Sequence, residues 1–538
     1  MLVNLFGASV CLAGLPLAVS TLDCTANGFK QGNIHVYEPG STNYNKFAPS
    51  MFSEFSTAEV LANIKFVVSP TNEAEAKIVL DLANKCKIRV LPRGGGHSYL
   101  GASVYTEQKS IVLRMKRFVP RSSQKTINID TVSGTATVGA GVILGEMYEE
   151  IHQASTPSKT FHLAGGTCPT VGIGIIFGGG KGYYSRKHGY LCDSVKSMRV
   201  VVYKNGKFTA VTASTTTNED LYYALLGGGG GNFGLVTEVT FELIRLYNDK
   251  DGNNVITFYK GGYDPNAASD KSLVGKFLKY STSKVADSND VYTRIQVDKS
   301  NAIGFHALCE CSKTGCENCV NAMNTLNGEM NGGQINHGTA YSEAFWEGGC
   351  HGIGEVNSLI DCAKAVESKT LSQKKNTVHK SMNLKTEGLE ANIKTALARV
   401  KESTSGFPMF EVDVVGGKMK QGSDKNSYPR GGGKYDFNLQ VFDTSSSRHN
   451  IHSIYNAFKT SDIGTAYPDY PDPELFNKDL AVPKNLHKLH YHDSPDYESF
   501  TARYTKNITA LENIQCKYNS IDMFRFANYV GSIKSKCS

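Results

Sequence analysis

The first half of the chain alternates short apolar runs with segments of helical periodicity. An apolar run at residues 64–68 predicts a strand that ends before Pro70, and residues 72–85 then carry apolar side chains at helical spacing. A second strand is predicted at residues 88–91, so strand, helix and strand follow in the order of a crossover unit. Further strands are predicted at residues 111–113, 135–138, 198–202 and 235–243, and further helices at residues 144–151 and 221–226.

The second half has a different pattern. Residues 410–414 and 435–441 alternate apolar with polar side chains, which is typical of an antiparallel sheet with one covered face. From residue 497 the tail predicts a helix that runs through Leu511 and Ile514. The fold class is therefore α+β with two domains, and the predicted boundaries are residues 21–246, 247–485 and a C-terminal segment 486–538.

Composition adds one unusual feature, which is the position of the glycines. The 538 residues include 53 glycines, and 24 of these lie between Gly94 and Gly234, about a quarter of the chain. They show no collagen period, so they indicate backbone that something must approach closely. The net charge is +7 and no long Lys/Arg block is present, so no nucleic-acid partner is predicted.

The N-terminus resembles a secretory signal. Residues 1–20 carry no charged side chain and are mostly apolar, and Ala18 and Ser20 stand at the −3 and −1 positions of a cleavage site. A short membrane anchor is the alternative, but Gly14 and Pro16 interrupt the apolar stretch, so we favour cleavage and an extracellular protein with no membrane association afterwards. Asn507 begins an N-glycosylation sequon, a weak signal on its own.

The chain has 13 cysteines, of which Cys11 lies in the signal. Four of them, Cys309, Cys311, Cys316 and Cys319, are closely spaced and could form either a zinc site or disulfides. Because secreted thiols are usually oxidised, we predict disulfides, with the participation of Cys350 and Cys362 left open, and no metal. A further candidate pair near the C-terminus is Cys516 with Cys537.

Three glycine loops carry the candidate chemistry. The first, Arg93-Gly94-Gly95-Gly96-His97-Ser98, follows a predicted buried strand, and the third is a five-glycine run at residues 227–231. Peptide N–H groups of such turns form concave anion sites. The second loop, residues 165–182, contains Cys168, which is either a reactive thiol beside a ligand or half of a disulfide.

With these three loops the sequence resembles the berberine-bridge-enzyme-like FAD-linked oxidoreductases, within the vanillyl-alcohol-oxidase-type fold with its PCMH-type FAD-binding domain. The resemblance implies that residues 21–246 form an α/β FAD-binding domain, to which the C-terminal segment returns. Residues 247–485 would be the substrate domain, with an antiparallel sheet backed by helices. The matching stretches are residues 90–101, 138–145, 165–193, 220–237 and 503–533, while the middle of the chain matches only in broad layout.

The resemblance also implies how the cofactor is held. His97 would be joined to the 8α-methyl group of FAD and Cys168 to C6 of the ring, so the FAD would be bicovalently bound. Val171 matches a family position at which valine accompanies access of molecular oxygen, which favours an oxidase over a dehydrogenase. The other predicted cofactor-binding residues are Arg93, Gly94, Gly95, Gly96, Ser98, Gly172, Gly174, Asp193, Gly231, Asn232, Gly234 and Val236.

On the substrate side, Tyr504 matches the tyrosine that acts as catalytic base in alcohol- and sugar-oxidising members. Gln440 matches a position beside the substrate, although it could equally be an ordinary strand residue. A phenol titrates near pH 10, so a base role requires nearby positive charge, and Lys181 is a candidate source of it. A Cys24–Cys86 disulfide is implied as well.

The function implied is a secreted FAD-dependent oxidase. It would take hydride from a hydroxyl-bearing small molecule, a sugar or an aromatic or secondary-metabolite alcohol, and pass electrons to O2 to give H2O2. Two alternatives remain: a dehydrogenase that uses another acceptor, and a secreted binding protein that has lost the flavin chemistry. The sequence departs from the family pattern at Ile175, Ile176, Lys181 and Leu226. If Cys168 holds the flavin, eleven mature cysteines remain, so at least one is unpaired within the chain.

Overall fold

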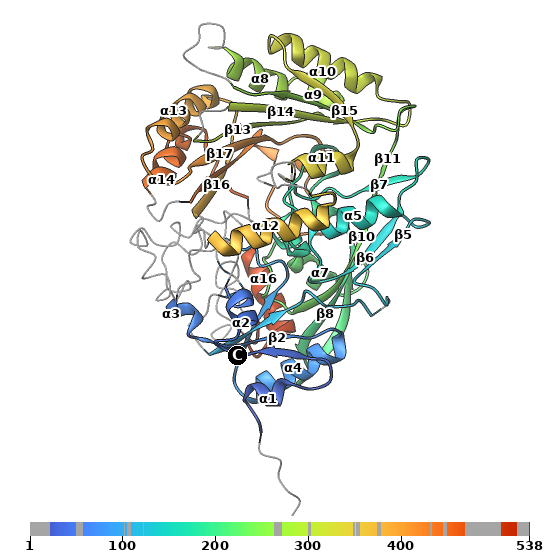
Figure 1. Cartoon of the computed structure of the whole chain (residues 1–538), viewed down its shortest axis with the longest axis vertical. Coiled ribbons are helices and arrows are strands. Elements are labelled where there is room, and N and C mark those ends of the chain that lie inside the picture. The colour runs from blue at the N-terminus through green and yellow to red at the C-terminus, as the bar shows by residue number, and fades with distance from the viewer. Residues whose placement is uncertain are drawn as a thin grey trace, which may run out of the picture.

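The predicted α+β, two-domain fold is confirmed (Figure 1). Near its N-terminal end the chain forms a four-stranded sheet of order β1-β2-β4-β3, in which β4 pairs parallel with β2 and with β3. The computed structural model describes residues 22–49, 58–99, 101, 103–104, 109–121, 123–262, 272–299, 303–347, 350, 356–373, 378–430, 433–444, 449–467, 507–524 and 537.

The predicted crossover unit is part of this sheet: α4 connects β2 to the edge strand β3, and β4 lies between these two strands. Asn72 caps the crossover helix α4, since its side-chain oxygen accepts a hydrogen bond from the Glu75 amide, and Ala76, Val79 and Leu80 of α4 are fully buried. The first sheet and its helices are α1 (Ala26–Phe29), β1 (His35–Tyr37), α2 (Thr42–Phe47), α3 (Ala58–Leu61), β2 (Ile64–Ser69), α4 (Glu73–Lys85), β3 (Arg89–Arg93) and β4 (Ser110–Arg114).

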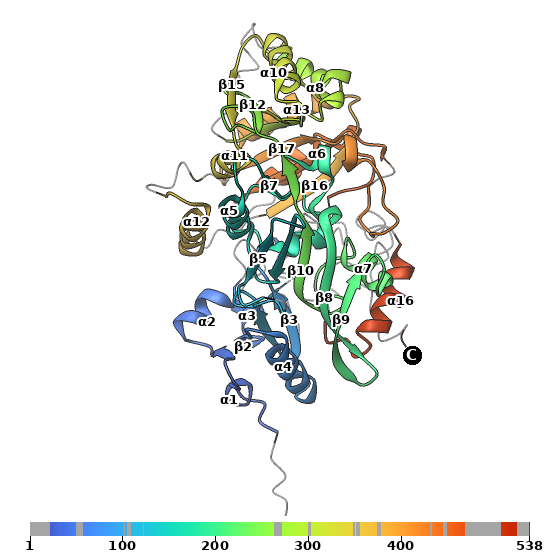
Figure 2. The ribbon, with the colours of Figure 1, turned by 90° about the vertical axis from the view of Figure 1, so that its right-hand side faces the viewer.

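A second sheet of order β5-β6-β10-β8-β9 is antiparallel throughout and packs against helices α5 and α7. The tail helix α16 lies beside α7, where Lys517 forms an ion pair with Asp220 at 2.6 Å (Figure 2). The elements of this part are β5 (Ile127–Asp130), β6 (Thr135–Gly139), α5 (Leu144–Ala154), β7 (Thr160–His162), α6 (Ser185–His188), β8 (Val195–Lys204), β9 (Lys207–Ser214), α7 (Glu219–Leu225), β10 (Leu235–Glu242), β11 (Ile244–Leu246) and α16 (Ile508–Tyr518).

The middle of the chain forms a seven-stranded antiparallel sheet of order β15-β12-β14-β13-β17-β18-β16. Its apolar face, which includes Phe305, Val412 and Leu439, is buried under α8, α10, α13 and α14 (Figures 1 and 2). The elements are β12 (Val255–Lys260), α8 (Leu273–Ser281), α9 (Lys284–Ser288), β13 (Tyr292–Val297), β14 (Ile303–Glu310), α10 (Glu317–Glu329), β15 (Gln334–Gly338), α11 (Ala340–Glu347), α12 (Leu359–Gln373), β16 (Val378–Leu384), α13 (Leu389–Glu402), β17 (Met409–Val414), β18 (Phe437–Asp443) and α14 (His449–Asn456).

The opposite face of this sheet is polar, and it faces the glycine-rich half of the chain. One row of paired residues crosses all seven strands, and every member carries a polar group. In strand order the row consists of Gln334, Tyr259, His306, Arg294, Asp413, Asn438 and Asn383. We call this surface the polar face.

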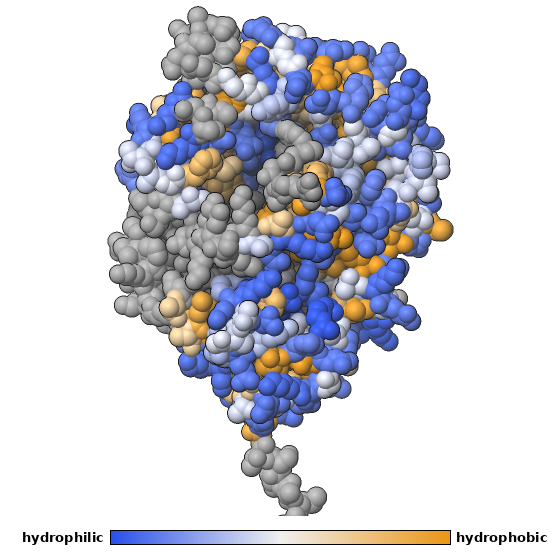
Figure 3. All heavy atoms as spheres, in the orientation of Figure 1, coloured by the Kyte–Doolittle hydropathy of each residue, from blue (hydrophilic) through white to orange (hydrophobic). Residues whose placement is uncertain are grey.

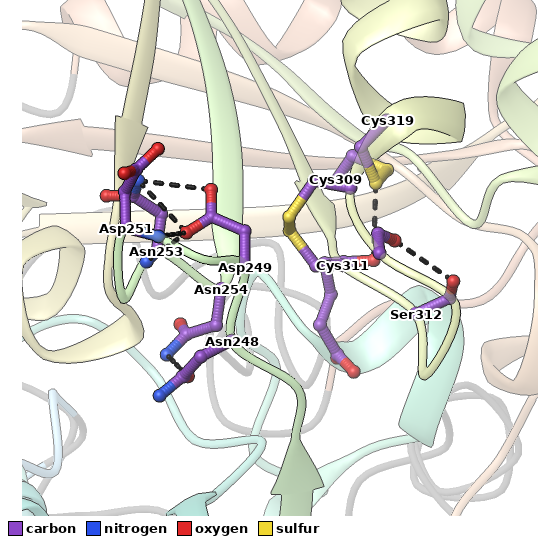
Figure 4. Close-up of a disulfide and its surroundings, with 12 residues drawn as sticks. Asn248, Asp249, Asp251, Asn253, Asn254, Cys309, Cys311, Ser312 and Cys319 are labelled. Carbon is purple, nitrogen blue, oxygen red and sulfur yellow. Dashed lines mark hydrogen bonds between the residues drawn. A yellow bond between two sulfur atoms is a disulfide. The ribbon is translucent and has the colours of Figure 1, made fainter. Parts of the chain in front are cut away.

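The cysteines form disulfides, as predicted. Cys309 pairs with Cys319 and Cys311 with Cys316, beside the turn that contains Asp249 and Asn253 (Figure 4). The zinc alternative therefore does not apply to these four sulfurs. The remaining disulfides, including the Cys24–Cys86 pair that the resemblance implied, are Cys24–Cys86, Cys350–Cys362 and Cys516–Cys537.

Cys168 and Cys192 belong to no disulfide. The sequence count predicted one such cysteine besides Cys168 if Cys168 holds the flavin. Among the described residues no helix is both long and apolar enough to cross a membrane, and no cluster of His, Cys, Asp and Glu is arranged to hold a metal. The surface in Figure 3 is mostly hydrophilic, with hydrophobic side chains scattered across it.

Candidate functional site

The three glycine loops meet at one cavity of about 280 Å³. Residues of the four-stranded and five-stranded sheets and of the loops that follow them line it, and many of these residues are glycines. The predicted cofactor-binding residues that line it are Arg93, Gly94, Gly95, Gly96, His97, Ser98, Cys168, Val171, Gly172, Gly174, Gly231, Gly234 and Val236.

The close approach of the first two loops explains why glycine stands at their crossing. A Cβ added to Gly95 would lie 2.5 Å from the Gly172 nitrogen, and one added to Gly172 would lie 2.4 Å from the Gly95 nitrogen. Both positions therefore exclude any larger residue. In the third loop, Gly229 and Gly231 have φ of 85° and 76°, a region in which side chains are strained.

His97 and Cys168 converge on one hydroxyl. The His97 Nε2 atom lies 2.6 Å from Thr170 Oγ1, and the Cys168 Sγ atom lies 3.4 Å from the same oxygen. The loops thus bring together two nucleophilic side chains that are 71 positions apart in the sequence. Thr170 was not among the predicted site residues, although its place between Cys168 and Val171 in the glycine loop could have drawn attention to it.

Burial sets the protonation of both groups. It lowers the pKa of His97 to about 3, with the nearby Arg93 charge adding to the effect, so the imidazole is neutral at ordinary pH. Burial also raises the pKa of the Cys168 thiol, against hydrogen bonds from Thr170 that lower it. Neither side chain carries a charge near neutral pH, which leaves a nucleophilic imidazole and a protonated thiol on the cavity wall.

Arg93 lines the cavity, but its guanidinium is engaged elsewhere. Nη1 donates to the carbonyl oxygens of Phe47 and Pro49, the latter at 2.6 Å, and burial lowers the pKa of Arg93 to about 10. The side chain therefore ties the end of α2 to the first glycine loop.

Two predicted cofactor residues do not line the cavity. Asp193 accepts hydrogen bonds from the Tyr190 amide at 2.8 Å and from the side chains of Asn426 and Arg430. Asn232 is fully buried, and its carbonyl oxygen accepts from Asn519 at 2.9 Å. In this structure both residues hold neighbouring loops together.

Lys181 and Gln440 meet at a carboxylate on the polar face that the sequence did not single out, Asp413. Lys181 Nζ donates to Asp413 Oδ2 and, at 2.9 Å, to Asn438, while Gln440 Nε2 donates to the same Oδ2 at 3.0 Å. The other oxygen, Oδ1, accepts from Arg294 at 2.6 Å and from Tyr292 at 2.7 Å. We call these residues the Asp413 cluster.

The cluster is closed to solvent, with Asp413 at 0% exposure and Lys181 at 7%. Burial alone would raise the pKa of Asp413, but the charges of Arg294 and Lys181 hold it well below its ordinary value. Burial lowers the pKa of Lys181, and Asp413 opposes that change. The charge of Lys181 is therefore matched by a carboxylate inside the protein.

Tyr504 lies outside the described residues, so its approach to Lys181 stays a prediction. The two isoleucines that depart from the family pattern are placed: Ile175 lines the cavity, and Ile176 is buried in the core of the second sheet.

Comparison with known proteins points to a flavin. Residues 64–212, from β2 through most of β9, match the model of the FAD binding domain family. Berberine bridge enzyme-like 18 of Arabidopsis thaliana is 28% identical over 210 residues, covering 36% of this chain and 38% of that protein. Reticuline oxidase of Papaver somniferum is 32% identical over 158 residues, 29% of this chain and 28% of that protein. The chain therefore aligns with less than half the length of these curated relatives.

Solved structures extend the likeness of fold to the rest of the chain. The wild-type BBE-like 1 protein of Physcomitrella patens superposes with a TM-score of 0.72 over 94% of this chain and 98% of that one, at 20% identity. Phl p 4, described as a grass pollen allergen with glucose dehydrogenase activity, gives a TM-score of 0.72 over 93% and 97%, at 21% identity.

The residues at the cavity fit a flavin: three glycine loops contribute to its wall, and His97 and Cys168, two side chains able to bond covalently to a ligand, lie on it. The chain thus carries an FAD-binding domain and, as its sequence indicated, resembles the berberine-bridge-enzyme-like FAD-linked oxidoreductases.

Proposed function

We propose that the protein is a secreted FAD-dependent oxidase of hydroxyl-bearing small molecules, with FAD bound covalently through His97 and Cys168. The observation that carries the proposal is the shared contact of these two side chains with Thr170 at a glycine-walled cavity. When bound, FAD supplies a hydride acceptor that molecular oxygen can reoxidise to give hydrogen peroxide.

The chain's own residues supply binding and orientation. The Thr170 hydroxyl fixes the direction of the His97 ring and of the Cys168 thiol, and the neutral imidazole keeps a lone pair for bond formation. The glycine loops admit a flat ligand to the backbone because no Cβ stands in the way.

On the substrate side, Tyr504 is the proposed base, which takes the proton of the substrate hydroxyl. Gln440 is held by Asp413 through one of its N–H groups, so its carbonyl oxygen and second N–H are left to orient a hydroxyl. Since Asp413 matches the charge of Lys181, we assign to Lys181 the role of securing this carboxylate and not that of a free cation beside Tyr504.

A dehydrogenase is the second candidate, because Phl p 4 is described as having glucose dehydrogenase activity. Val171, which lines the cavity, favours the oxidase through the family pattern. The purified protein, expressed with adequate FAD, is screened over sugars and aromatic alcohols for peroxide. In parallel, reduction of an artificial acceptor is measured without oxygen.

For an oxidase we expect yellow protein whose colour survives denaturation, together with peroxide release. Reduction of the acceptor without peroxide identifies the dehydrogenase. Colourless, folded protein would exclude both and leave a secreted binding protein.

Secretion is part of the proposal, supported by five disulfides among the described residues. N-terminal sequencing of protein recovered from the medium should begin at Thr21. Asn507 caps α16 through its side-chain oxygen, and its exposed position is compatible with glycosylation, which a mass shift on glycosidase treatment would reveal.

A further inference from the structure

Four Asn-Gly pairs occur in the chain, and they begin at Asn27, Asn205, Asn327 and Asn331. In such a pair the glycine nitrogen can attack the side-chain amide of the asparagine, because no Cβ on the glycine obstructs the approach. The reaction needs a glycine N–H that is open to solvent and a backbone that can rotate. The structure holds the four pairs in different surroundings, and the proposed function uses none of them.

The Asn205-Gly206 pair forms the tip of the β8–β9 hairpin (Figure 2). Lys204, the last residue of β8, pairs with Lys207, the first residue of β9, so these two residues alone make the turn. Their φ angles are 54° and 77°, as in the type I′ turn that Asn-Gly favours. Both residues are exposed, and a Cβ added to Gly206 would have no neighbour within 4 Å.

The two groups that would react are not held by the fold. Among the described residues, no hydrogen bond joins the Gly206 N–H or the Asn205 side chain to another group. Attack requires Asn205 to leave its left-handed backbone conformation, and the tip of a hairpin can do this by opening its last strand pair. The next pair towards the core, Tyr203 with Phe208, does not have to open.

Positive charge lies on both sides of the turn. Lys204 and Lys207 flank the pair, and in the part of the chain that the structure describes neither lysine forms an ion pair with a carboxylate. A nearby positive charge stabilises the negative nitrogen that attacks and the negative oxygen that forms on the amide. The surroundings of Asn205 therefore favour the reaction.

The pair at Asn331 is blocked by hydrogen bonds. The Gly332 N–H donates to the Asn327 carbonyl oxygen at 2.9 Å, and Lys260 Nζ donates to the Gly332 carbonyl oxygen at 3.0 Å. The nitrogen that would attack is thus engaged, and both peptide groups of the glycine are fixed.

The remaining two pairs lie in helices. Asn327 and Gly328 belong to α10, where helical hydrogen bonds hold the backbone. Asn27 and Gly28 belong to α1, and a Cβ on Gly28 would lie 2.0 Å from the Asp23 carbonyl oxygen, so the chain is closely packed there. Side chains of a helix tilt towards its N-terminus, which keeps each asparagine amide away from the nitrogen that follows it.

We propose that spontaneous deamidation of this protein occurs at Asn205 ahead of the other three pairs. The Gly206 nitrogen gives its proton to solvent and bonds to Asn205 Cγ, while the bond from Cγ to Nδ2 breaks and the amino group takes up a proton and leaves as ammonia. The cyclic succinimide then adds one water molecule and opens to aspartate or isoaspartate. Water is the only co-reactant, and the step is independent of the proposed function.

The product changes the charge and the turn. Either product replaces a neutral amide by a carboxylate, so the formal net charge of the chain falls from +7 to +6. Isoaspartate also adds one carbon to the backbone of a two-residue turn whose length sets the strand register. Folded protein kept in solution should therefore acquire a more acidic form, which ion-exchange chromatography separates.

The test is peptide mapping by mass spectrometry of the folded protein after storage in mildly alkaline buffer. Each pair is followed through the mass increase that replacement of NH2 by OH produces. The same protein, reduced and unfolded in denaturant, is the reference in which all four pairs are open to solvent. The variant is Lys207→Gln, and its matched control is Lys313→Gln, an exposed lysine in a turn of the other domain.

In the folded protein we expect Asn205 to convert at least about fivefold faster than Asn331, because Gly332 must first break one hydrogen bond. Lys207→Gln should slow conversion at Asn205 about twofold, since it removes a positive charge near the attacking nitrogen. Lys313→Gln should leave this rate unchanged. In the unfolded protein the four rates should approach one another.

Faster conversion at Asn27, Asn327 or Asn331 than at Asn205 in the folded protein would overturn the proposal. An Asn205 that stays intact in the folded protein, under conditions that convert it in the unfolded chain, would overturn it as well. Because the measurement needs neither flavin nor substrate, failure of the proposed oxidase would not affect its outcome.

Discussion

The two groups of predicted site residues that the structure describes, at the FAD cavity and in the Asp413 cluster, are built on opposite principles. The FAD cavity is rich in glycine, the backbones of Gly95 and Gly172 meet there too closely for a side chain at either position, and its two reactive groups are neutral. The Asp413 cluster is made of side chains, with a carboxylate between two cations and two further donors. Glycines let a flat ligand come close to the backbone, whereas buried side chains that bond to one another hold each other in fixed positions.

The largest effect is expected at Tyr504, the proposed base. Tyr504→Phe should slow substrate oxidation by roughly 10²–10⁴-fold, because it removes the proton acceptor but keeps the ring. Stopped-flow measurement of substrate oxidation under anaerobic conditions checks this. An unaltered rate would remove Tyr504 from the mechanism.

The backbone character of the FAD cavity is tested at Gly172. Gly172→Ala should abolish the yellow colour or separate the loops, since the new Cβ would lie 2.4 Å from the Gly95 nitrogen. Gly174→Ala is the matched control, because there the nearest atom of Phe177 lies 3.7 Å away. Absorbance measures the flavin content per protein molecule. Equal losses of flavin in both variants would contradict the idea that only Gly172 lacks space for a side chain.

The side-chain character of the Asp413 cluster is tested by Asp413→Asn. This change leaves Lys181 buried without its carboxylate and Arg294 paired only with Glu411 at 3.6 Å, and it should cost about 3–5 kcal/mol in the free energy of unfolding. Chemical denaturation at neutral pH measures it. The double variant Lys181→Met/Asp413→Asn should lose less free energy of unfolding than Asp413→Asn alone, because it no longer buries the charge of Lys181 without a partner.

The same cluster predicts a pH dependence. The pKa of Asp413 is lowered in the folded protein, so its contribution to stability is present above the unfolded value near 3.9 and lost as the pH falls through the folded value. The stability difference between the unmodified protein and Asp413→Asn should therefore be constant from pH 8 to pH 5 and shrink below about pH 4. If this stability difference instead grew as the pH fell below about 4, the pKa of Asp413 could not be lowered in the folded protein.

The smallest expected effect is a change of one in the number of reactive thiols, which tests the attachment of the flavin to Cys168. With the flavin attached to Cys168, the denatured, unreduced mature protein should expose one thiol, that of Cys192, and the apoprotein should expose two. Thiol titration distinguishes these counts. Cys168→Ala should change the flavin spectrum while the His97 attachment still retains the colour after denaturation.

The sequence determined the parts that depend on local patterns. Helix α4 was readable from its apolar spacing and begins one residue after the predicted start, because Asn72 serves as its cap. The sequence also predicted the glycine loops, because a run of five glycines such as residues 227–231 indicates backbone that must come close to a ligand or to another part of the chain. Counting predicted one cysteine outside the disulfides in addition to a flavin-bound Cys168, and the structure identified it as Cys192.

The tertiary structure decided what depends on strand register and on contacts between distant segments. Asp413 looked like one polar residue in an alternating strand, and only the pairing of β13, β17 and β18 put Arg294 and Gln440 beside it. Likewise, Asp193 and Asn232 lie in stretches that match the family pattern, but in the structure they form hydrogen bonds with residues of neighbouring segments. The local sequence pattern determines on which face of a strand a side chain lies. Its partners across the sheet depend on the pairing of strands that are far apart in the sequence.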